Sequence, residues 1–231
     1  MIQTIQQQHV DEAITSRKSV RAFLPDPIDR ADIEQILAVA SRAPSGSNIQ
    51  PWKAYVITGE PLRALSDALL AAYEDPEKWG PLQEEYRYYP HEWASPYIER
   101  RRTVGIAMYQ LLGIGKQDKD RMRAQHGRNF RFFDAPVGLM FSVDRTMNAG
   151  SWLDFGCFLQ NVMTAARARG LDTCPQAAFN PYHRIIRPHI GMPDSEILMC
   201  GMALGKADQS AVVNSLQTER EPVSVFARFI Q

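Results

Sequence analysis

The sequence predicts one domain of the α/β or α+β class, built around a central sheet of about four or five strands. Strand-like segments alternate with helical segments along the chain, which is typical of these two classes. Apolar residues make up 45% and aromatic residues 10% of the 231 residues, enough for a substantial core. No internal repeat or low-complexity stretch divides the chain. We therefore expect residues 1–231 to form a single domain.

The first third of the chain predicts three helices and one strand. Residues 9–17 favour a short helix, and Asp29 is placed to cap a second helix that runs to about Arg42 with apolar residues at three- and four-residue steps. Residues 53–58 are rich in strand-forming side chains. Pro61 is suited to open the next helix, in which leucines recur on one face.

The middle of the chain changes character at residues 73–97, where seven tyrosines and tryptophans are spread among prolines and charges. This stretch is a poor continuous helix and predicts either a lid or insertion over a binding site, or a surface excursion whose rings pack on the sheet or on a partner. The patterns at 98–112 and 118–133 are helical, and the second of these is strongly basic.

The last third of the chain carries the most apolar elements. Residues 135–143 form the near-continuous apolar run of a strand buried on both faces, and residues 195–205 predict the last core strand. Between them, residues 151–169 predict the most hydrophobic helix, with Gly170 as its stop. Pro181 can open a further short helix. Residues 206–231 form a mostly polar C-terminal extension.

Composition and motifs exclude several classes of function. Lys and Arg balance Asp and Glu at 26 each, which removes a bulk attraction to nucleic acid or to an anionic membrane. No secretory signal and no apolar run of about 20 residues is present. Cys157, Cys174 and Cys200 lack the spacing of a zinc site or disulfide framework, so we expect buried free thiols, no metal centre and a cytoplasmic protein.

Two short stretches suggest a binding site. The run SRKSVRAF places Arg17, Lys18, Ser19 and Arg21 close together, either as a solvated basic turn or as a phosphate grip, because guanidinium and hydroxyl groups donate to phosphate oxygens. The second stretch, RAPSGSNIQPW at 42–52, contains two prolines and a glycine. It is either an ordinary turn or a loop whose main chain approaches a flat ligand closely.

The order and spacing of these motifs resemble the flavin-dependent nitroreductase family. Its members carry an Arg-x-Ser-x-Arg/Lys motif followed by a Pro-Ser-Ser/Gly-x-Asn-x-Gln-Pro-Trp loop, and both match here. The resemblance continues through DAPVGLMF, the long apolar helix, GMALG and an arginine near the C-terminus, and so covers most of the chain. It implies an α+β fold with a mostly antiparallel sheet, in an intertwined homodimer that binds FMN at the subunit interface.

The resemblance also assigns residues to FMN. It implies that Arg17, Ser19, Lys18 and Arg220 hold the phosphate, although Thr218 stands where relatives often have a second basic residue. Arg21, Asn129 and Arg131 are expected at the pyrimidine edge, where a cation favours the reduced flavin; for Arg128 a solvated helix face is the alternative. The loop of the other subunit contributes Pro44, Ser45, Gly46 and Asn48. The segment facing flavin N5 consists of Pro175, Gln176, Ala177 and Ala178, where relatives often have Glu-Gly at the last two positions.

The implied activity is an NAD(P)H-dependent reduction with ping-pong exchange of hydride through the flavin, without an acid, base or nucleophile from the protein. Expected acceptors are small, flat aromatic molecules such as nitroaromatics or quinones. NADH and NADPH are not distinguished by these residues. Two alternatives remain: another flavin reaction on the same scaffold, such as reductive dehalogenation, flavin reduction or flavin fragmentation, and a flavin-free binding protein that kept the fold.

Overall fold

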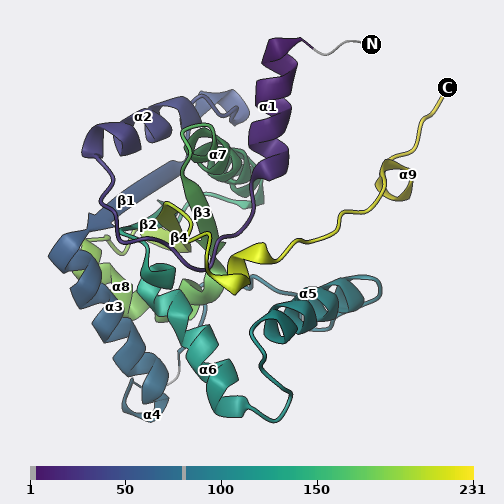
Figure 1. The fold of residues 1–231 in the computed structure, drawn as a ribbon. Helices are drawn as coiled ribbons and strands as arrows, with labels where there is room; N and C mark the ends of the chain where they lie inside the picture. The colour runs from purple at the N-terminus through teal and green to yellow at the C-terminus, as the bar shows by residue number, and fades with distance from the viewer. Residues whose placement is uncertain (1–3, 80–81) are drawn as a thin grey trace.

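The structure, a computed structural model, describes residues 4–79 and 82–231 and is organised around one four-stranded sheet (Figure 1). The strands are β1 (Trp52–Thr58), β2 (Val137–Asp144), β3 (Asp172–Gln176) and β4 (Glu196–Gly205). They lie in the order β1-β2-β4-β3, and every neighbouring pair is antiparallel. The α+β class and the predicted number of strands are confirmed.

Strands β2 and β4 occupy the centre of the sheet and explain the two long apolar runs. All ten residues of β4 are buried, and so are the first seven of β2. Strand β3 was not recognised as a strand in the sequence because it is short and contains Pro175. A proline removes one ladder donor, which an edge position tolerates. In the strand order β3 is at the edge of the sheet and pairs with β4 on one side, so the backbone on its other side is open to a further segment.

Helices cover both faces of the sheet, and short helices lie at its periphery (Figure 1). They are α1 (Ile5–Ser16), α2 (Arg30–Ala40), α3 (Gly59–Glu74), α4 (Pro76–Trp79), α5 (Tyr97–Leu111), α6 (Lys119–Gly127), α7 (Ala149–Arg167), α8 (His183–Ile190) and α9 (Val223–Phe226). Helices α2 and α7 share one apolar cluster with the sheet. Helices α3 and α8 share the other, together with the 3-10 segment Arg128–Asp134.

The predicted helix over residues 118–133 is wrong at its C-terminal end. Helix α6 ends at Gly127, and the chain continues as an irregular 3-10 segment. There Phe132 and Phe133 adopt left-handed backbone angles, with φ of 50° and 54°. Both rings are buried in the core. The sequence pattern missed this break because burial of the two rings, and not local helix propensity, sets the backbone conformation. By contrast, Gly170 ends α7 as predicted, with φ of 72°.

The aromatic stretch at 73–97 is irregular after α4, and residues 80 and 81 within it lie outside the described residues. Tyr73 belongs to α3, where its ring contacts Phe130. Tyr86 reaches the core, because its hydroxyl donates to the carbonyl of Met199 and accepts from Asn180 Nδ2. The segment between residues 82 and 96 is thus attached to the sheet by specific contacts.

Three peripheral elements expose apolar side chains. Helices α1 and α5 have no buried residue, and the C-terminal tail that carries α9 extends away from the rest of the chain (Figure 1). The exposed side chains are Ile5, Val10 and Ile14 on α1, Val104, Ile106 and Leu111 on α5, and Val223, Val225, Phe226, Phe229 and Ile230 on the tail. Such a concentration of apolar surface is typical of an interaction interface.

We expect Gly201→Ala to destabilise the protein by about 1–3 kcal/mol through overpacking. A Cβ at this central position of β4 would lie 2.3 and 2.6 Å from two ring carbons of the buried Phe179. The melting temperature measured by circular dichroism should fall by about 2–4 °C per kcal/mol. Gly150→Ala is the matched control, because nothing lies within 4 Å of a Cβ there. Equal melting temperatures for the two variants would contradict this packing argument.

Candidate functional site

A cavity of about 840 Å³ lies where the C-terminal end of α1 meets β3 and the segment that precedes α9. We call it the basic cavity. It is lined by Ile14, Thr15, Ser16, Arg17, Lys18, Gln160, Arg167, Asp172, Gln209, Leu216, Gln217, Thr218 and Arg220. The structure therefore brings Arg17 and Lys18 together with Arg220 from the opposite end of the chain.

Of the four cations among the described lining residues of the basic cavity, Arg167 alone has a carboxylate partner. Arg167 pairs with Asp172 at 3.2 Å, and Lys18 donates to the carbonyl of Asn214. In the described part of the chain, neither Arg17 nor Arg220 has a carboxylate within 4.0 Å. Burial lowers the pKa of the Arg17 guanidinium, and the positive charge of Arg220 lowers it further. An anion bound between the two guanidinium groups would relieve this repulsion.

The N-terminal motif is positioned by β3. Ser19 forms a parallel bridge with Thr173, and the N–H of Val20 donates to the Thr173 carbonyl at 3.0 Å. Val20 and Ala22 are buried. In an extended segment alternate side chains share a side, so Ser19 and Arg21 point away from that apolar contact. Against the larger effect of burial, the charge of Arg21 and a side-chain hydrogen bond with Ser19 both act to lower the pKa of the Cys174 thiol on β3. Both residues therefore lie beside that strand.

Asn214 fixes the same motif from the C-terminal part of the chain. Its buried side chain accepts from the N–H of Arg21 at 2.8 Å and donates to the carbonyls of Ala22 and Asp208 at 2.8 and 2.9 Å. Its own carbonyl accepts from Lys18 Nζ. The sequence does not reveal Asn214 as a site residue, because a lone asparagine in a polar tail carries no pattern that distinguishes it. It is a positioning residue for the basic motif.

Gln176 and Asn129 meet at the far end of β3. Gln176 Nε2 donates to the Asn129 carbonyl at 2.9 Å and to Asn129 Oδ1 at 3.2 Å. Gln176 Oε1 and Thr173 Oγ1 are buried and have no hydrogen-bond partner. Buried polar atoms are normally paired, so these two atoms along one strand indicate a polar ligand or water beside β3. Ala177 and Ala178 then open the 3-10 segment Ala177–Tyr182, whose first N–H groups lack acceptors within the segment.

The three cysteines are free, but only two have the predicted burial. Cys174 and Cys200 are buried, whereas Cys157 on α7 is exposed, so the expectation of three buried thiols is wrong for Cys157. Burial raises the pKa of the Cys174 thiol to about 11 and that of Cys200 to about 12. Neither is therefore a reactive thiolate at neutral pH. Cys174 serves as a packing residue under the motif, as expected.

A second cavity, of about 360 Å³, lies further along β3 and α7. We call it the aromatic cavity. It is lined by Tyr86, Arg87, Tyr88, Trp152, Phe155, Leu159, Pro175, Gln176, Ala177, Met199 and Cys200. The rings of Tyr86 and Trp152 lie 5.1 Å apart and tilted, an arrangement common for aromatic pairs. This cavity includes three of the four residues expected beside flavin N5.

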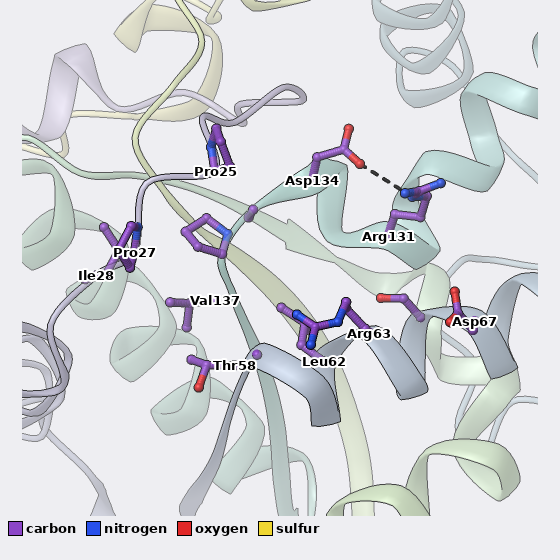
Figure 2. A pocket seen from close by; sticks show the side chains of 14 residues that line it. Pro25, Pro27, Ile28, Thr58, Leu62, Arg63, Asp67, Arg131, Asp134 and Val137 are labelled. Carbon is purple, nitrogen blue, oxygen red and sulfur yellow. Dashed lines mark ion pairs between the residues drawn. The ribbon is translucent and has the colours of Figure 1, made fainter.

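Arg131 is not brought together with the basic motif. It lines a separate cavity of about 680 Å³ with Pro25, Pro27 and the start of α3, and pairs with Asp134 at 3.5 Å (Figure 2). Arg128 pairs with Asp134 as well, at 2.9 Å. Figure 2 shows the Arg131 and Asp134 side chains next to each other on the same segment, joined by this ion pair. This cavity shares no lining residue with the basic cavity or the aromatic cavity.

The loop at residues 44–48 lines neither the basic nor the aromatic cavity. Instead the N–H of Gly46 donates to Asp154 Oδ2 on α7 at 3.1 Å. Positive φ angles occur at Ser47, Asn48 and Gln50 and not at Gly46. A Cβ on Gly46 would lie 3.9 Å from Asp154 Oδ2, an ordinary contact. The described part of the chain therefore places no steric requirement for glycine at position 46.

These residues fit a flavin mononucleotide by their chemistry. Arg17 and Arg220 supply unneutralised guanidinium groups of the kind that bind phosphate. The unpaired Gln176 Oε1 and the polar atoms of Asn129 suit the polar edge of a heterocycle, and the aromatic cavity suits a planar ring. No group of three or more His, Cys, Asp or Glu within residues 4–79 and 82–231 is arranged to hold a metal. In the same residues, no helix has the length and apolar character needed to cross a bilayer.

Comparison with known proteins gives the same family over nearly the whole chain. The model of the nitroreductase family matches residues 14–206. A 4-nitrobenzoate reductase of Pseudomonas putida is 44% identical over 220 residues, covering 95% of both chains. A nitrobenzene nitroreductase of Ectopseudomonas oleovorans is 39% identical over 222 residues, covering 96% of each.

Two solved structures share the fold. The FMN- and NADPH-dependent nitroreductase NfnB of Sphigopyxis sp. strain HMH has a TM-score of 0.91 and 40% identity, covering 96% of this chain and 99% of that one. The FMN-dependent nitroreductase NfnB of Mycobacterium smegmatis, solved with NADPH, also has a TM-score of 0.91, with 29% identity and coverage of 97% and 99%. With its fold, its motifs and these matches in agreement, the chain belongs to the nitroreductase family.

Proposed function

We propose that the protein is an FMN-dependent oxidoreductase that uses NADH or NADPH to reduce nitroaromatic or quinone-type acceptors. The observation that carries this proposal is the succession of the basic and aromatic cavities along β3 and α7. Asp172 in the first cavity and Pro175 in the second are three strand residues apart, roughly 10 Å. A single ligand with a phosphate at one end and a flat ring at the other suits this spacing. The named activities of the relatives support the same function.

The proposal gives each group of residues a task. Arg17, Lys18, Ser19 and Arg220 hold the phosphate. Pro175, Gln176, Ala177, Ala178 and Asn129 contact the ring, the two alanines through their main chain. Pro44, Ser45, Gly46 and Asn48 act on the site of a second protomer. FMN, when bound, supplies hydride transfer between the nicotinamide and the acceptor. The protein's part is to bind, to orient and to set the charge around the ring.

For the cation beside the ring, the geometry favours Arg21 over Arg131. Arg21 lies beside Cys174, and its Nη1 donates to the Ser19 carbonyl at 3.1 Å. The resemblance also implies Arg131 at this edge, but Arg131 would have to leave its ion pair with Asp134 to reach β3. A cation near the ring stabilises the negative charge that develops on two-electron reduction. We therefore propose that Arg21 has the main influence on reduction potential.

We also propose a homodimer in the cytoplasm. The apolar surfaces of α1, α5 and the C-terminal tail over residues 206–231 support association, because exposed apolar area of this extent favours burial. The failure of the 44–48 loop to line its own protomer's cavities supports a role in another copy. Three free cysteines, one of them exposed, fit a reducing compartment. In this proposal residues 1–231 act as one domain, and the lid expected within residues 73–97 is the described part that lines the aromatic cavity, Tyr86, Arg87 and Tyr88, fixed by Tyr86.

The decisive experiment is purification followed by an anaerobic acceptor panel. We expect a yellow protein that oxidises NADH or NADPH when 4-nitrobenzoate, nitrobenzene or a benzoquinone is added. The number of nicotinamides consumed per nitro group, two for a hydroxylamine and three for an amine, gives the product. A colourless, folded protein that does not bind added FMN would favour the flavin-free alternative. Flavin bleaching by NAD(P)H without acceptor reduction would favour another flavin reaction.

We expect Arg17→Ala to weaken FMN binding about 10- to 150-fold, because a charge-assisted hydrogen bond contributes about 1.5–3 kcal/mol. The dissociation constant is measured by quenching of FMN fluorescence on titration with cofactor-free protein. Arg63→Ala is the control, because Arg63 lines the cavity of Figure 2 and pairs with Glu60. Equal FMN affinity in wild type and Arg17→Ala would remove Arg17 from the phosphate site.

A shared site predicts complementation between two defective chains. Gly46→Ala should leave the melting temperature of the cofactor-free protein nearly unchanged, because its Cβ makes only an ordinary contact within the protomer. If the loop packs on FMN, the same change should weaken FMN binding. A heterodimer of Arg17→Ala and Gly46→Ala chains then contains one site with both defects and one intact site. We expect coexpressed, differently tagged chains to recover tight binding of one FMN per heterodimer, whereas a loop acting on its own protomer gives no recovery.

A further inference from the structure

The aromatic cavity contains one charged side chain among the lining residues that the structure describes, Arg87. The walls are otherwise aromatic, apolar or uncharged, with Trp152, Phe155 and Leu159 from α7 and Tyr88 beside Arg87. In the described part of the chain no carboxylate lies within ion-pair distance of the Arg87 guanidinium. Its neighbour Glu84 instead accepts a long contact from the N–H of Tyr88, at 3.5 Å. The Arg87 guanidinium therefore has its parallel N–H donors available for a ligand in the aromatic cavity.

The two residues before Arg87 hold its backbone in place. Glu85 is almost buried and accepts two contacts from Arg187 Nη2 at 2.8 and 2.9 Å and one from Arg145 at 2.6 Å. Tyr86 is attached to β4 through the Met199 carbonyl. The backbone of Arg87 is consequently held in place at the cavity wall, although its side chain is exposed. A fixed starting point reduces the entropy lost when a side chain binds a ligand.

The size of the cavity limits what Arg87 can meet there. A volume of about 360 Å³ is near the lower end of the roughly 300–1,000 Å³ that is usual for small-molecule sites. In the proposed function the flavin ring occupies part of this volume, so the remaining space suits one substituted aromatic ring stacked on the flavin better than a whole dinucleotide. A guanidinium group presents two parallel N–H donors, which match the two oxygens of a carboxylate. A ring bearing a carboxylate satisfies both the aromatic walls and the single cation.

We propose that Arg87 binds the anionic substituent of a carboxylated nitroaromatic acceptor that stacks on the flavin at the open side of the aromatic cavity, and so gives the enzyme a preference for nitroaromatic acids. This inference rests on the proposed function and names its substrate class. Arg87 takes no part in hydride transfer; it is a specificity-determining residue that binds the end of the acceptor remote from the nitro group. Phosphate on a nicotinamide dinucleotide has related anionic chemistry, and the experiment distinguishes it.

The test compares 4-nitrobenzoate with 4-nitrobenzamide, a neutral molecule of nearly the same shape, as acceptors of the FMN-loaded enzyme. For Arg87→Gln we expect kcat/KM for 4-nitrobenzoate to fall about 10- to 100-fold, the range of a charge-assisted hydrogen bond. The value for 4-nitrobenzamide should change less than about twofold. Arg87→Lys should recover part of the loss, because it restores the charge without the fork. Arg63→Gln controls for the loss of one positive charge elsewhere on the surface.

Stopped-flow reduction of the enzyme-bound FMN by NADPH and by NADH completes the test. Unchanged rates with both nicotinamides in Arg87→Gln support the assignment to the acceptor. Slower reduction by NADPH alone, with 4-nitrobenzoate turnover otherwise intact, would assign Arg87 to the nicotinamide phosphate and overturn the proposal. Equal losses for benzoate and benzamide would overturn it too. If wild type reduces neither nitroarene with either nicotinamide, the proposed function itself fails, which is a different result from loss of the preference.

Discussion

The attachment of the N-terminal segment to the open side of β3 is the constraint on which the site depends. Because β3 is an edge strand, its outer side can receive the short extended segment around Ser19 and Val20. That one contact carries Arg17 and Arg21 to the strand. The buried Asn214 then connects the same segment to the C-terminal part of the chain. Both ends of the polypeptide are in this way brought to one cavity.

The strong apolar patterns of the sequence predicted the frame of the fold well. Strand β4 and helix α7 were found at nearly their observed bounds, because each combines a long apolar run with a clear end signal. Strand β3 was missed, since five residues that include Pro175 contain no strand periodicity. The end of α6 was misplaced because Phe132 and Phe133 are held left-handed by their burial in the tertiary core. A local sequence pattern predicts an element correctly unless contacts with distant parts of the chain set the backbone conformation.

The candidate site was also only partly predictable from the sequence. The family resemblance implies that Arg17, Ser19 and Arg220 hold one ligand, and the basic cavity brings the two arginines together. Sequence alone could not show that Arg131 faces Asp134, because the direction of its side chain is set by the irregular 3-10 segment. Nor could it identify Asn214, whose hydrogen bonds to the basic motif join residues about 190 positions apart in the chain. Chemistry can be inferred from residue types, whereas orientation requires the fold.

The buried charges around Glu85 illustrate how the fold fixes orientation. Burial acts to raise the pKa of Glu85, but hydrogen bonding from Arg145 and the charges of His183 and Arg187 lower it overall, so the carboxylate stays ionised. Ion pairs of this kind add little net stability, because desolvation offsets the attraction. Their benefit is geometric, since a carboxylate held by two arginines has few alternative positions. Located directly before Tyr86 and Arg87, this cluster determines which side chains of an otherwise irregular segment face the aromatic cavity.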